Sequence, residues 1–183
     1  MEYDLKKEIG NDGYILRMAT LDDASDVSAI MQAGYDSLEN KDLFVTEPPE
    51  WVEMVLSDPK NGFGVMAISP EGEPVGYFIV YYPGPEDEMN YGFDIGFSYE
   101  QRCHVANMET TAVLPKARGH HLEARMVKFA EESIDKDHIY YMGTVSPDNP
   151  ASYKAAESNG YVCMATKEKY GGKMRRVYLK TVL

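Results

Sequence analysis

The chain has 183 residues, of which 44% are hydrophobic and 26% charged, a length and composition typical of one folded domain. The 18 Lys and Arg residues against 30 Asp and Glu residues give a net charge of −12, which argues against a general nucleic-acid binder because a phosphate backbone favours excess positive charge. No window reaches the ~18 consecutive apolar residues that span a bilayer, and the first residues lack the basic and apolar regions of a signal peptide. We therefore expect a single cytoplasmic domain over residues 1–183, with no nucleic-acid partner and no membrane partner.

The positive charge is concentrated in two segments. Residues 116–128 carry a net charge of +3 and residues 167–183 a net charge of +5, so the remaining residues carry −20. This distribution suits an anionic small ligand on one side of the protein and a cationic partner on the other. The alternative, that these segments are ordinary solvated charged faces, stays open at this point.

The first half of the chain predicts a strand, two helices and a β-hairpin. Thr20 is expected to cap the first helix, and prolines at 48 and 49 are expected to open the second. Apolar residues recur at helical spacing in both helices, and β-branched and aromatic residues fill the strands. The predicted elements are residues 14–18, 20–35, 48–57, 63–68 and 75–82.

The second half predicts strands alternating with helices. A long connection rich in acids and aromatics, residues 83–104, comes first, and loops of this length are uncommon unless they are functional or disordered. The elements that follow are a strand at 105–114, a helix from Gly119 to about Asp135, a strand at 139–145, a helix from Asn149 to Asn159 and a hairpin at 161–169 and 174–182. The order predicts an α/β (α+β) fold with a mixed, mainly antiparallel sheet.

The basic segment 116–128 coincides with a strand, a short turn and the start of a helix. A helix N-terminus exposes unpaired N–H groups and binds phosphate when the backbone can approach closely. Gly119 permits that approach, and Arg118 adds a forked donor. The pattern indicates a phosphate site. The alternative is that Lys116 and Arg118 are ordinary surface charges.

Three motifs, in this order and with fitting elements between them, resemble the GNAT family of N-acetyltransferases. They are Leu16-Arg17-x-Ala19-Thr20, Val113-x-Pro115-x-Ala117-Arg118-Gly119, and Asn149-x-x-Ser152 followed by Gly160-Tyr161. The resemblance covers most of the chain. It implies a central sheet flanked by helices on both faces, an acyltransferase activity and acetyl-CoA as the cofactor.

The resemblance also implies which residues hold the coenzyme. His121 and Glu123 stand where the family usually has small residues, so only one glycine of its glycine-rich turn remains. Ala156 stands where the family usually has a tyrosine acid, and Tyr153 is the nearest hydroxyl. The expected cofactor-binding residues are Ala112, Val113, Leu114, Arg118, Gly119, His120, His121, Leu122, Asn149 and Ser152.

Acetyl transfer to an amine requires a base, because an amine with a pKa near ~10 is almost wholly protonated at neutral pH. Glu109, four residues before Val113, lies where the family often places a carboxylate base. The alternative interpretation is that Glu109 lies on the solvated face of the strand and is not a base. Backbone N–H groups from Ala112 to Leu114 would meet the oxyanion, and Tyr153 or water would protonate the leaving thiolate. The four histidines lack HExxH spacing, so no metal site is expected.

We therefore expect a single-domain N-acetyltransferase that transfers acetyl directly in a ternary complex. Residues 81–100 combine aromatics with five acids, which favours a cationic amine acceptor, unless this segment is simply a solvated acidic loop. The alternative function is a non-catalytic CoA-binding or protein-interaction module that kept the fold. The sequence is silent on oligomeric state, although homodimers are frequent in the family.

Overall fold

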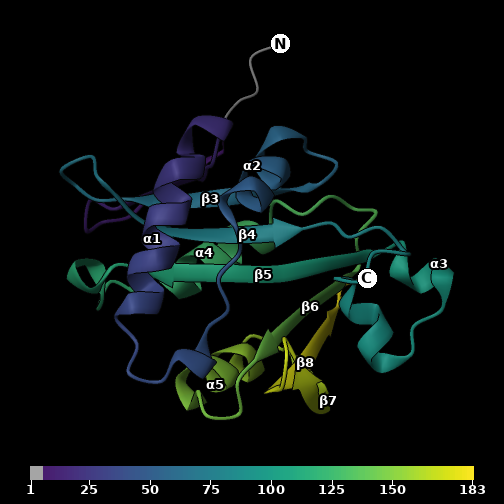
Figure 1. The fold of residues 1–183 in the computed structure, drawn as a ribbon. Coiled ribbons are helices and arrows are strands. Elements are labelled where there is room, and N and C mark those ends of the chain that lie inside the picture. Colours follow the sequence, from purple (N-terminus) through teal and green to yellow (C-terminus); the bar gives the residue numbers. More distant parts are fainter. Residues whose placement is uncertain (1–5) are drawn as a thin grey trace. The chain divides into compact units, whose positions relative to one another are not determined.

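The computed structural model describes residues 6–183 (Figure 1). These residues divide into two compact units. Unit 1 holds the described residues up to 37 together with 46–80 and 110–133. Unit 2 holds residues 38–45, 81–109 and 134–183. Strand β5 (Val105–Val113) begins in unit 2 and ends in unit 1.

The strands of unit 1 follow one another as neighbours in the order β1-β2-β3-β4-β5. The first four are β1 (Lys7–Ile9), β2 (Ile15–Met18), β3 (Gly62–Ile68) and β4 (Pro74–Tyr81). The pairs β1/β2 and β2/β3 are antiparallel. Strand β1 was not predicted from the sequence, because its outer position leaves it exposed, with 67% of Ile9 accessible, and it therefore lacks an apolar pattern.

Three helices of unit 1 cover both faces of these strands. Helices α1 (Ala24–Asp36) and α2 (Pro49–Ser57) lie on one face and α4 (Leu122–Glu131) on the other (Figure 1). Their buried residues include Val27, Val52 and Met126, which pack at the predicted helical spacing. The predicted flanking of the sheet on both faces is thus confirmed in this unit.

Helix α4 is shorter than the predicted span of 119–135. Gly119 and His121 have φ of +89° and +54°, a left-handed conformation that cannot continue a right-handed helix, so the helix begins at Leu122. At the other end the Glu132 N–H bonds back to Lys128 O, and the helix stops at Glu131.

The strands of unit 2 are neighbours in the order β5-β6-β8-β7. They include β6 (Tyr140–Val145), β7 (Val162–Lys169) and β8 (Lys173–Thr181). Strands β5 and β6 are parallel, whereas β6/β8 and β7/β8 are antiparallel. The described strands therefore form a mixed, mainly antiparallel eight-stranded sheet, as predicted. The core of this unit contains Tyr91, Val105, Met142 and Val177.

The long connection 83–104 is ordered and contains two short helices, a 3-10 helix η3 (Tyr91–Ile95) and α3 (Tyr99–Arg102). The buried amide of Asn90 donates to the carbonyls of Gly84 and Arg102, at 3.1 and 3.0 Å. The Arg102 guanidinium in turn donates to the carbonyls of Pro85 and Phe97, both at 2.7 Å. These contacts join residues up to 17 positions apart, so local patterns could not predict them.

Helix α5 (Pro150–Ser158) begins as the sequence predicted. The Asn149 side chain accepts the Ser152 N–H at 3.2 Å, and Pro150 occupies the first helical turn. Within residues 6–183, no helix is long and apolar enough to cross a bilayer.

Candidate functional site

The turn that follows β5 presents a run of unpaired backbone donors. Its short 3-10 helix, η4 (Pro115–Ala117), is anchored by Ala117, which is 1% exposed. The first hydrogen bond of the following helix runs from the Arg125 N–H to His121 O. The N–H groups of residues 119–124 have no acceptor within the described chain. Donors of this kind at a helix start suit a phosphate or pyrophosphate group.

The side chains of this basic turn differ in availability. Lys116 pairs with Glu73 on the surface. His120 lies 3.2 Å from Asp12 Oδ2, and its ring lies 4.3 Å from that of Tyr14. Arg118 is exposed and has no hydrogen bond or ion pair within residues 6–183. Of the cations in this turn, Arg118 is the one that forms no ion pair with a described residue, although its charge lowers the pKa of Glu123 against the larger effect of burial.

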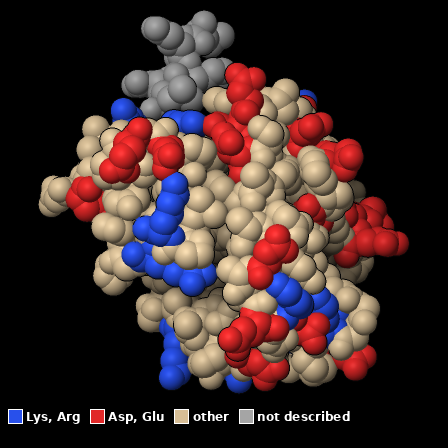
Figure 2. All heavy atoms as spheres, turned by 60° about the vertical axis from the view of Figure 1, so that its left-hand side comes forward, with Lys and Arg blue, Asp and Glu red and all other residues tan. Residues whose placement is uncertain are grey.

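Basic and acidic side chains are interspersed on the face that Figure 2 draws. Figure 2 shows Lys and Arg in small groups on a face that also carries many Asp and Glu side chains. Such an arrangement suits a compact anion held by one or two cations rather than a long polyanion.

His121 adopts a left-handed conformation that favours glycine, with φ of +54°. We expect His121→Gly to raise the free energy of unfolding by about 0.5–1 kcal/mol, because removing Cβ relieves strain that exceeds the added backbone entropy of glycine. Affinity for CoA should be retained, since the backbone donors survive the change. Chemical denaturation and calorimetric CoA titration would measure the two effects.

His121→Ala is the matched control, because it removes the imidazole but keeps the strained conformation. It should not gain stability. A gain equal to that of His121→Gly would contradict the strain argument, and a CoA affinity lost in both variants would show that the imidazole itself donates a needed bond.

The end of β5 offers fewer oxyanion donors than the sequence suggested. The Leu114 N–H, one of the expected donors, instead donates to Val75 O at 2.8 Å. Gly76 permits this close approach of β4, since a Cβ there would meet Ala112 O and Val113 Cγ2 at 3.2 Å. An oxyanion would therefore have to use donors other than Leu114.

The parallel ladder between β5 and β6 covers only three residue pairs. It runs from Val105 opposite Tyr140 to Asn107 opposite Met142, although β5 continues to Val113. From Met108 onward, and thus at Glu109, β5 no longer pairs with β6. Backbone groups released from a ladder need another partner, which a ligand can supply.

Glu109 is half-buried and held by two side chains of unit 2. Tyr91 donates to its Oε1 at 2.7 Å, and the Asn107 amide donates to its Oε2 at 3.1 Å. Burial, followed by the charge of Glu109, raises the pKa of Tyr91 well above its usual value, so this phenol stays a protonated donor. The carboxylate is therefore oriented, and the solvated-face alternative does not describe it.

The predicted residues of α5 have structural partners of their own. The side-chain oxygen of Asn149 is engaged as the helix cap, and Ser152 supplies the capped N–H. The Arg176 guanidinium lies 4.1 Å from the centre of the Tyr153 ring, which fits a packing role for that tyrosine. Helix α5 and the basic turn belong to different units.

The acids of residues 81–100 are partly engaged inside unit 2. Asp94 pairs with Lys169 and, at 3.1 Å, with Lys167. Asp87 accepts a hydrogen bond from Tyr81 at 2.5 Å, and Glu86 lies 3.8 Å from Arg102. The other two, Glu88 and Glu100, are exposed and form no ion pair with a described residue. The segment therefore offers less free negative charge than its composition indicates.

Glu47 is a carboxylate that the sequence did not single out. It lies in the loop before α2, half-buried, and burial raises the pKa of its carboxyl group. Its charge also raises the pKa of Tyr77, after the larger effect of burial, and the Tyr77 hydroxyl lies 2.9 Å from Thr110 Oγ1. Its carboxylate has no hydrogen-bond partner among residues 6–183. No local motif marks such a residue, because its environment is made by distant strands.

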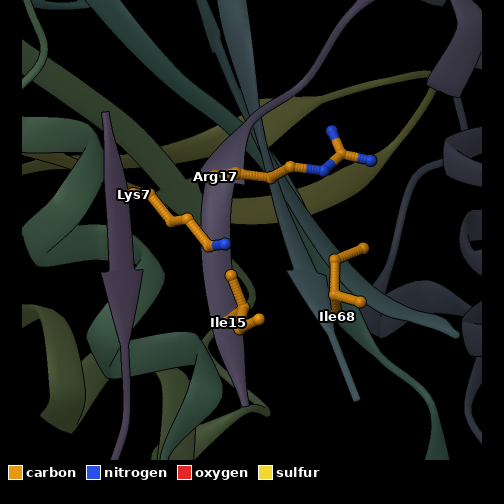
Figure 3. Close-up of a pocket in the computed structure, with 4 residues that line it drawn as sticks. All are labelled: Lys7, Ile15, Arg17 and Ile68. Atoms are coloured by element: carbon orange, nitrogen blue, oxygen red, sulfur yellow. The ribbon is translucent and has the colours of Figure 1, made fainter. Parts of the chain in front are cut away.

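A shallow hollow of about 330 Å³ lies over β1, β2 and β3. Figure 3 shows its lining residues, Lys7, Ile15, Arg17 and Ile68. The Arg17 guanidinium is bound to both carboxylate oxygens of Asp23, at 2.7 and 2.8 Å. The described lining of the hollow thus consists of two cationic and two aliphatic side chains. Across residues 6–183, no group of three or more His, Cys, Asp or Glu could hold a metal ion.

Comparison with known proteins gives one family match. The model of the acetyltransferase (GNAT) family matches residues 32–161. None of the curated proteins matches the chain.

Solved structures share the fold over nearly the whole chain. Ribosomal-protein-S5-alanine acetyltransferase from Vibrio fischeri is 14% identical with a TM-score of 0.69, covering 96% of this chain and 96% of its own. A GNAT acetyltransferase from Listeria monocytogenes is 15% identical with a TM-score of 0.67, covering 97% and 100%. The protein yncA from Salmonella typhimurium, solved with its cofactor acetyl-CoA, is 13% identical with a TM-score of 0.65, covering 92% and 93%. At such identities these matches establish the fold.

Proposed function

The chain belongs to the acetyltransferase (GNAT) family, and from that premise we propose that it acetylates a primary amine by direct attack in a ternary complex. The observation that carries the proposal is Glu109, a carboxylate fixed on β5 by Tyr91 and Asn107, four residues before Val113. Such a group can take the proton that an ammonium acceptor must lose before its nitrogen attacks.

The turn after β5 fits the pyrophosphate of acetyl-CoA. The six N–H groups of residues 119–124 have no acceptor among residues 6–183, and Arg118 forms no ion pair there. Together these groups match an anion with several oxygens. Val113 precedes this turn on β5. Asn149 and Ser152 are proposed as coenzyme contacts on the family resemblance, and Asn149 would bind while it caps α5.

Acetyl-CoA supplies an activated acetyl thioester. Glu109 accepts the proton of the ammonium, and the freed lone pair can then attack the acetyl carbon. Tyr153 or a water molecule donates a proton to the sulfur that leaves. Tyr153 carries this role in the absence of a tyrosine at position 156, where the chain has alanine.

We further propose a cationic acceptor. The net charge of −12 and the exposed side chains of Glu100 and Tyr99, which is 57% exposed, support it. Spermidine and a lysine-rich peptide should be turned over at least about tenfold faster than aspartate or glutamate. That preference should shrink as salt is added, because screening weakens attraction between exposed charges.

The test is consumption of acetyl-CoA with a panel of amines, at low and high ionic strength. The panel includes a peptide with an N-terminal alanine and phosphinothricin, because structural neighbours carry those substrates in their names. Faster turnover of acidic acceptors, unaffected by salt, would refute the cationic preference. Binding of CoA without consumption by any amine would refute the enzyme and leave the non-catalytic CoA-binding alternative.

A further inference from the structure

Glu109 stands at the end of a chain of hydroxyl groups in unit 2. Tyr91 donates to Glu109 Oε1 at 2.7 Å, and the Tyr91 and Tyr170 hydroxyls lie 2.9 Å apart. The Tyr170 hydroxyl in turn lies 3.0 Å from Thr144 Oγ1. The four residues come from η3, β5, β6 and the turn between β7 and β8.

The direction of the hydrogen bonds follows from the carboxylate. Glu109 can only accept, so the Tyr91 hydrogen points toward it. The Tyr91 oxygen must then accept from Tyr170, and the Tyr170 oxygen can accept from Thr144. All hydrogens of the chain thus point toward Glu109, an alignment in which each bond polarises the next.

The chain leads from the interior to the surface. Glu109 is half-buried, Tyr91 is 3% exposed and Tyr170 is 37% exposed. Tyr91 and Tyr170 therefore connect the carboxylate with a residue that is partly exposed.

Tyr170 occupies its place in spite of backbone strain. Its φ is +52°, a left-handed conformation that is unfavourable for a non-glycine residue. Gly171 and Gly172, which tolerate positive φ, follow it directly. Strain of this kind persists where the surroundings over-determine it and often marks a functional position.

Cations and counter-ions fix the two rings. Lys169 Nζ lies 5.1 Å from the Tyr91 ring centre and 5.6 Å from that of Tyr170, and it is paired with Asp94. The Arg175 guanidinium lies 5.7 Å from the Tyr170 ring centre. The rings are therefore held by charged groups that do not occupy their hydroxyls.

We propose that Tyr91 and Tyr170 are positioning residues that pass the proton captured by Glu109 to solvent. This inference rests on the proposed function. When Glu109 has taken a proton from the ammonium, its new O–H donates to the Tyr91 oxygen, and both phenol hydroxyls turn about their C–O bonds so that Tyr91 donates to Tyr170 and Tyr170 to water. In this reversed chain the Glu109 proton moves to the Tyr91 oxygen as the Tyr91 proton moves to the Tyr170 oxygen. The Tyr170 proton leaves to water. One proton passes from amine to solvent, the carboxylate is restored, and nothing is oxidised or reduced.

Both tyrosines suit transfer through neutral hydroxyls. Burial, and then the charge of Glu109, raises the pKa of Tyr170 to about 12 and that of Tyr91 well above its usual value. Neither phenol therefore ionises near neutral pH. Each can accept one proton as it releases another, which is the exchange that the relay requires.

Kinetics of the full chain test the relay. Tyr91→Phe and Tyr170→Phe should each lower kcat about tenfold or more, while KM for the amine changes less than about twofold. High concentrations of imidazole buffer should restore much of the kcat of Tyr170→Phe, because a mobile base can replace the exposed end of the relay. A merely structural role would not respond to buffer.

Tyr178→Phe is the matched control. Tyr178 is also a buried tyrosine of unit 2 that donates to a glutamate, Glu157, at 2.9 Å, but it lies outside the chain. Its kcat should stay near wild type. Thermal unfolding and CoA titration of each variant would show that the fold and the coenzyme site persist.

A measurement without turnover tests the hydrogen-bonded chain itself. In ¹³Cζ-tyrosine NMR, the Tyr91 signal, assigned by its loss in Tyr91→Phe, should shift in both Glu109→Gln and Tyr170→Phe and stay in place in Tyr178→Phe. An unmoved signal would overturn the chain whatever the enzyme does.

The outcomes separate the two proposals. A shifted Tyr91 signal with unchanged kcat in both tyrosine variants would overturn the relay and leave the proposed function intact. Absence of turnover with every amine would remove the proposed function and the relay with it, while the NMR result would still report whether the chain exists.

Discussion

Glu109→Gln is expected to lower kcat for acetyl transfer by about 10²- to 10³-fold, the usual contribution of a positioned base. Glutamine keeps the size of the side chain, and its carbonyl oxygen can still accept from Tyr91, but it cannot take a proton from the acceptor. Affinity for CoA should change by less than about twofold. Steady-state kinetics and calorimetric CoA titration would separate the loss of chemistry from a loss of binding.

Glu47→Gln is the matched control, because Glu47 is also a half-buried glutamate and has no role in the proposed reaction. Burial raises the pKa of Glu47 in the folded state, so the folded state binds the proton more readily than the unfolded state. The free energy of unfolding therefore falls as pH rises above the ordinary range for Glu. Glu47→Gln should therefore melt about 1–2 °C higher at pH 7, show no such gain at pH 4, and keep its kcat. A large loss of kcat in Glu47→Gln, with activity retained in Glu109→Gln, would identify Glu47 as the base and contradict the role proposed for Glu109.

Elements with local signals were predictable from the sequence. Apolar spacing marked α1, and an asparagine cap followed by proline marked α5. The hairpins needed only β-rich runs around turn residues. In each case the residues that decide the structure lie within one or two turns of one another, so a single sequence carries the information.

The environment of Glu109 could not be predicted in the same way. Its partners Tyr91 and Tyr170 lie 18 and 61 positions away, and they meet it only because the sheet brings β5 and the β7–β8 turn together within unit 2. The sequence identified the carboxylate through a family resemblance but gave no sign of the hydroxyl chain. The engagement of Leu114 with Val75 was hidden for the same reason.

The basic turn after β5 is a different case, because a residue other than glycine adopts a left-handed conformation there. A histidine at position 121 argues against a left-handed turn, yet the chain adopts that conformation there as well as at Gly119. Anchoring of the turn by the buried Ala117 offers a physical reason, since it fixes where the backbone must change direction. The conformation, and with it the row of N–H donors, is kept at the expense of strain.

Arg118→Ala is expected to weaken CoA binding about tenfold or more. Charge-assisted hydrogen bonds contribute about 1.5–3 kcal/mol, and 1.4 kcal/mol corresponds to a factor of ten in Kd. Arg118 is exposed and has no hydrogen bond or ion pair within residues 6–183, so its removal should leave the stability of the free protein nearly unchanged. Calorimetric titration measures the loss directly, and the rise in melting temperature at a fixed CoA concentration should shrink in step with it.

Lys116→Ala is the matched control, since it removes a cation two residues away that already pairs with Glu73 on the surface. Exposed pairs of this kind contribute at most about 1 kcal/mol, and an ammonium engaged by a carboxylate has less to offer an anion. Its CoA affinity should therefore stay within about twofold of wild type. Equal losses of CoA affinity in both variants would indicate a diffuse electrostatic effect, and both losses would then disappear at high salt. A specific Arg118 contact would instead leave Arg118→Ala weaker than Lys116→Ala at high salt. An Arg118→Ala protein that binds CoA as tightly as wild type would refute the assignment of this turn to the pyrophosphate. The six N–H donors of residues 119–124 would then have no proposed ligand.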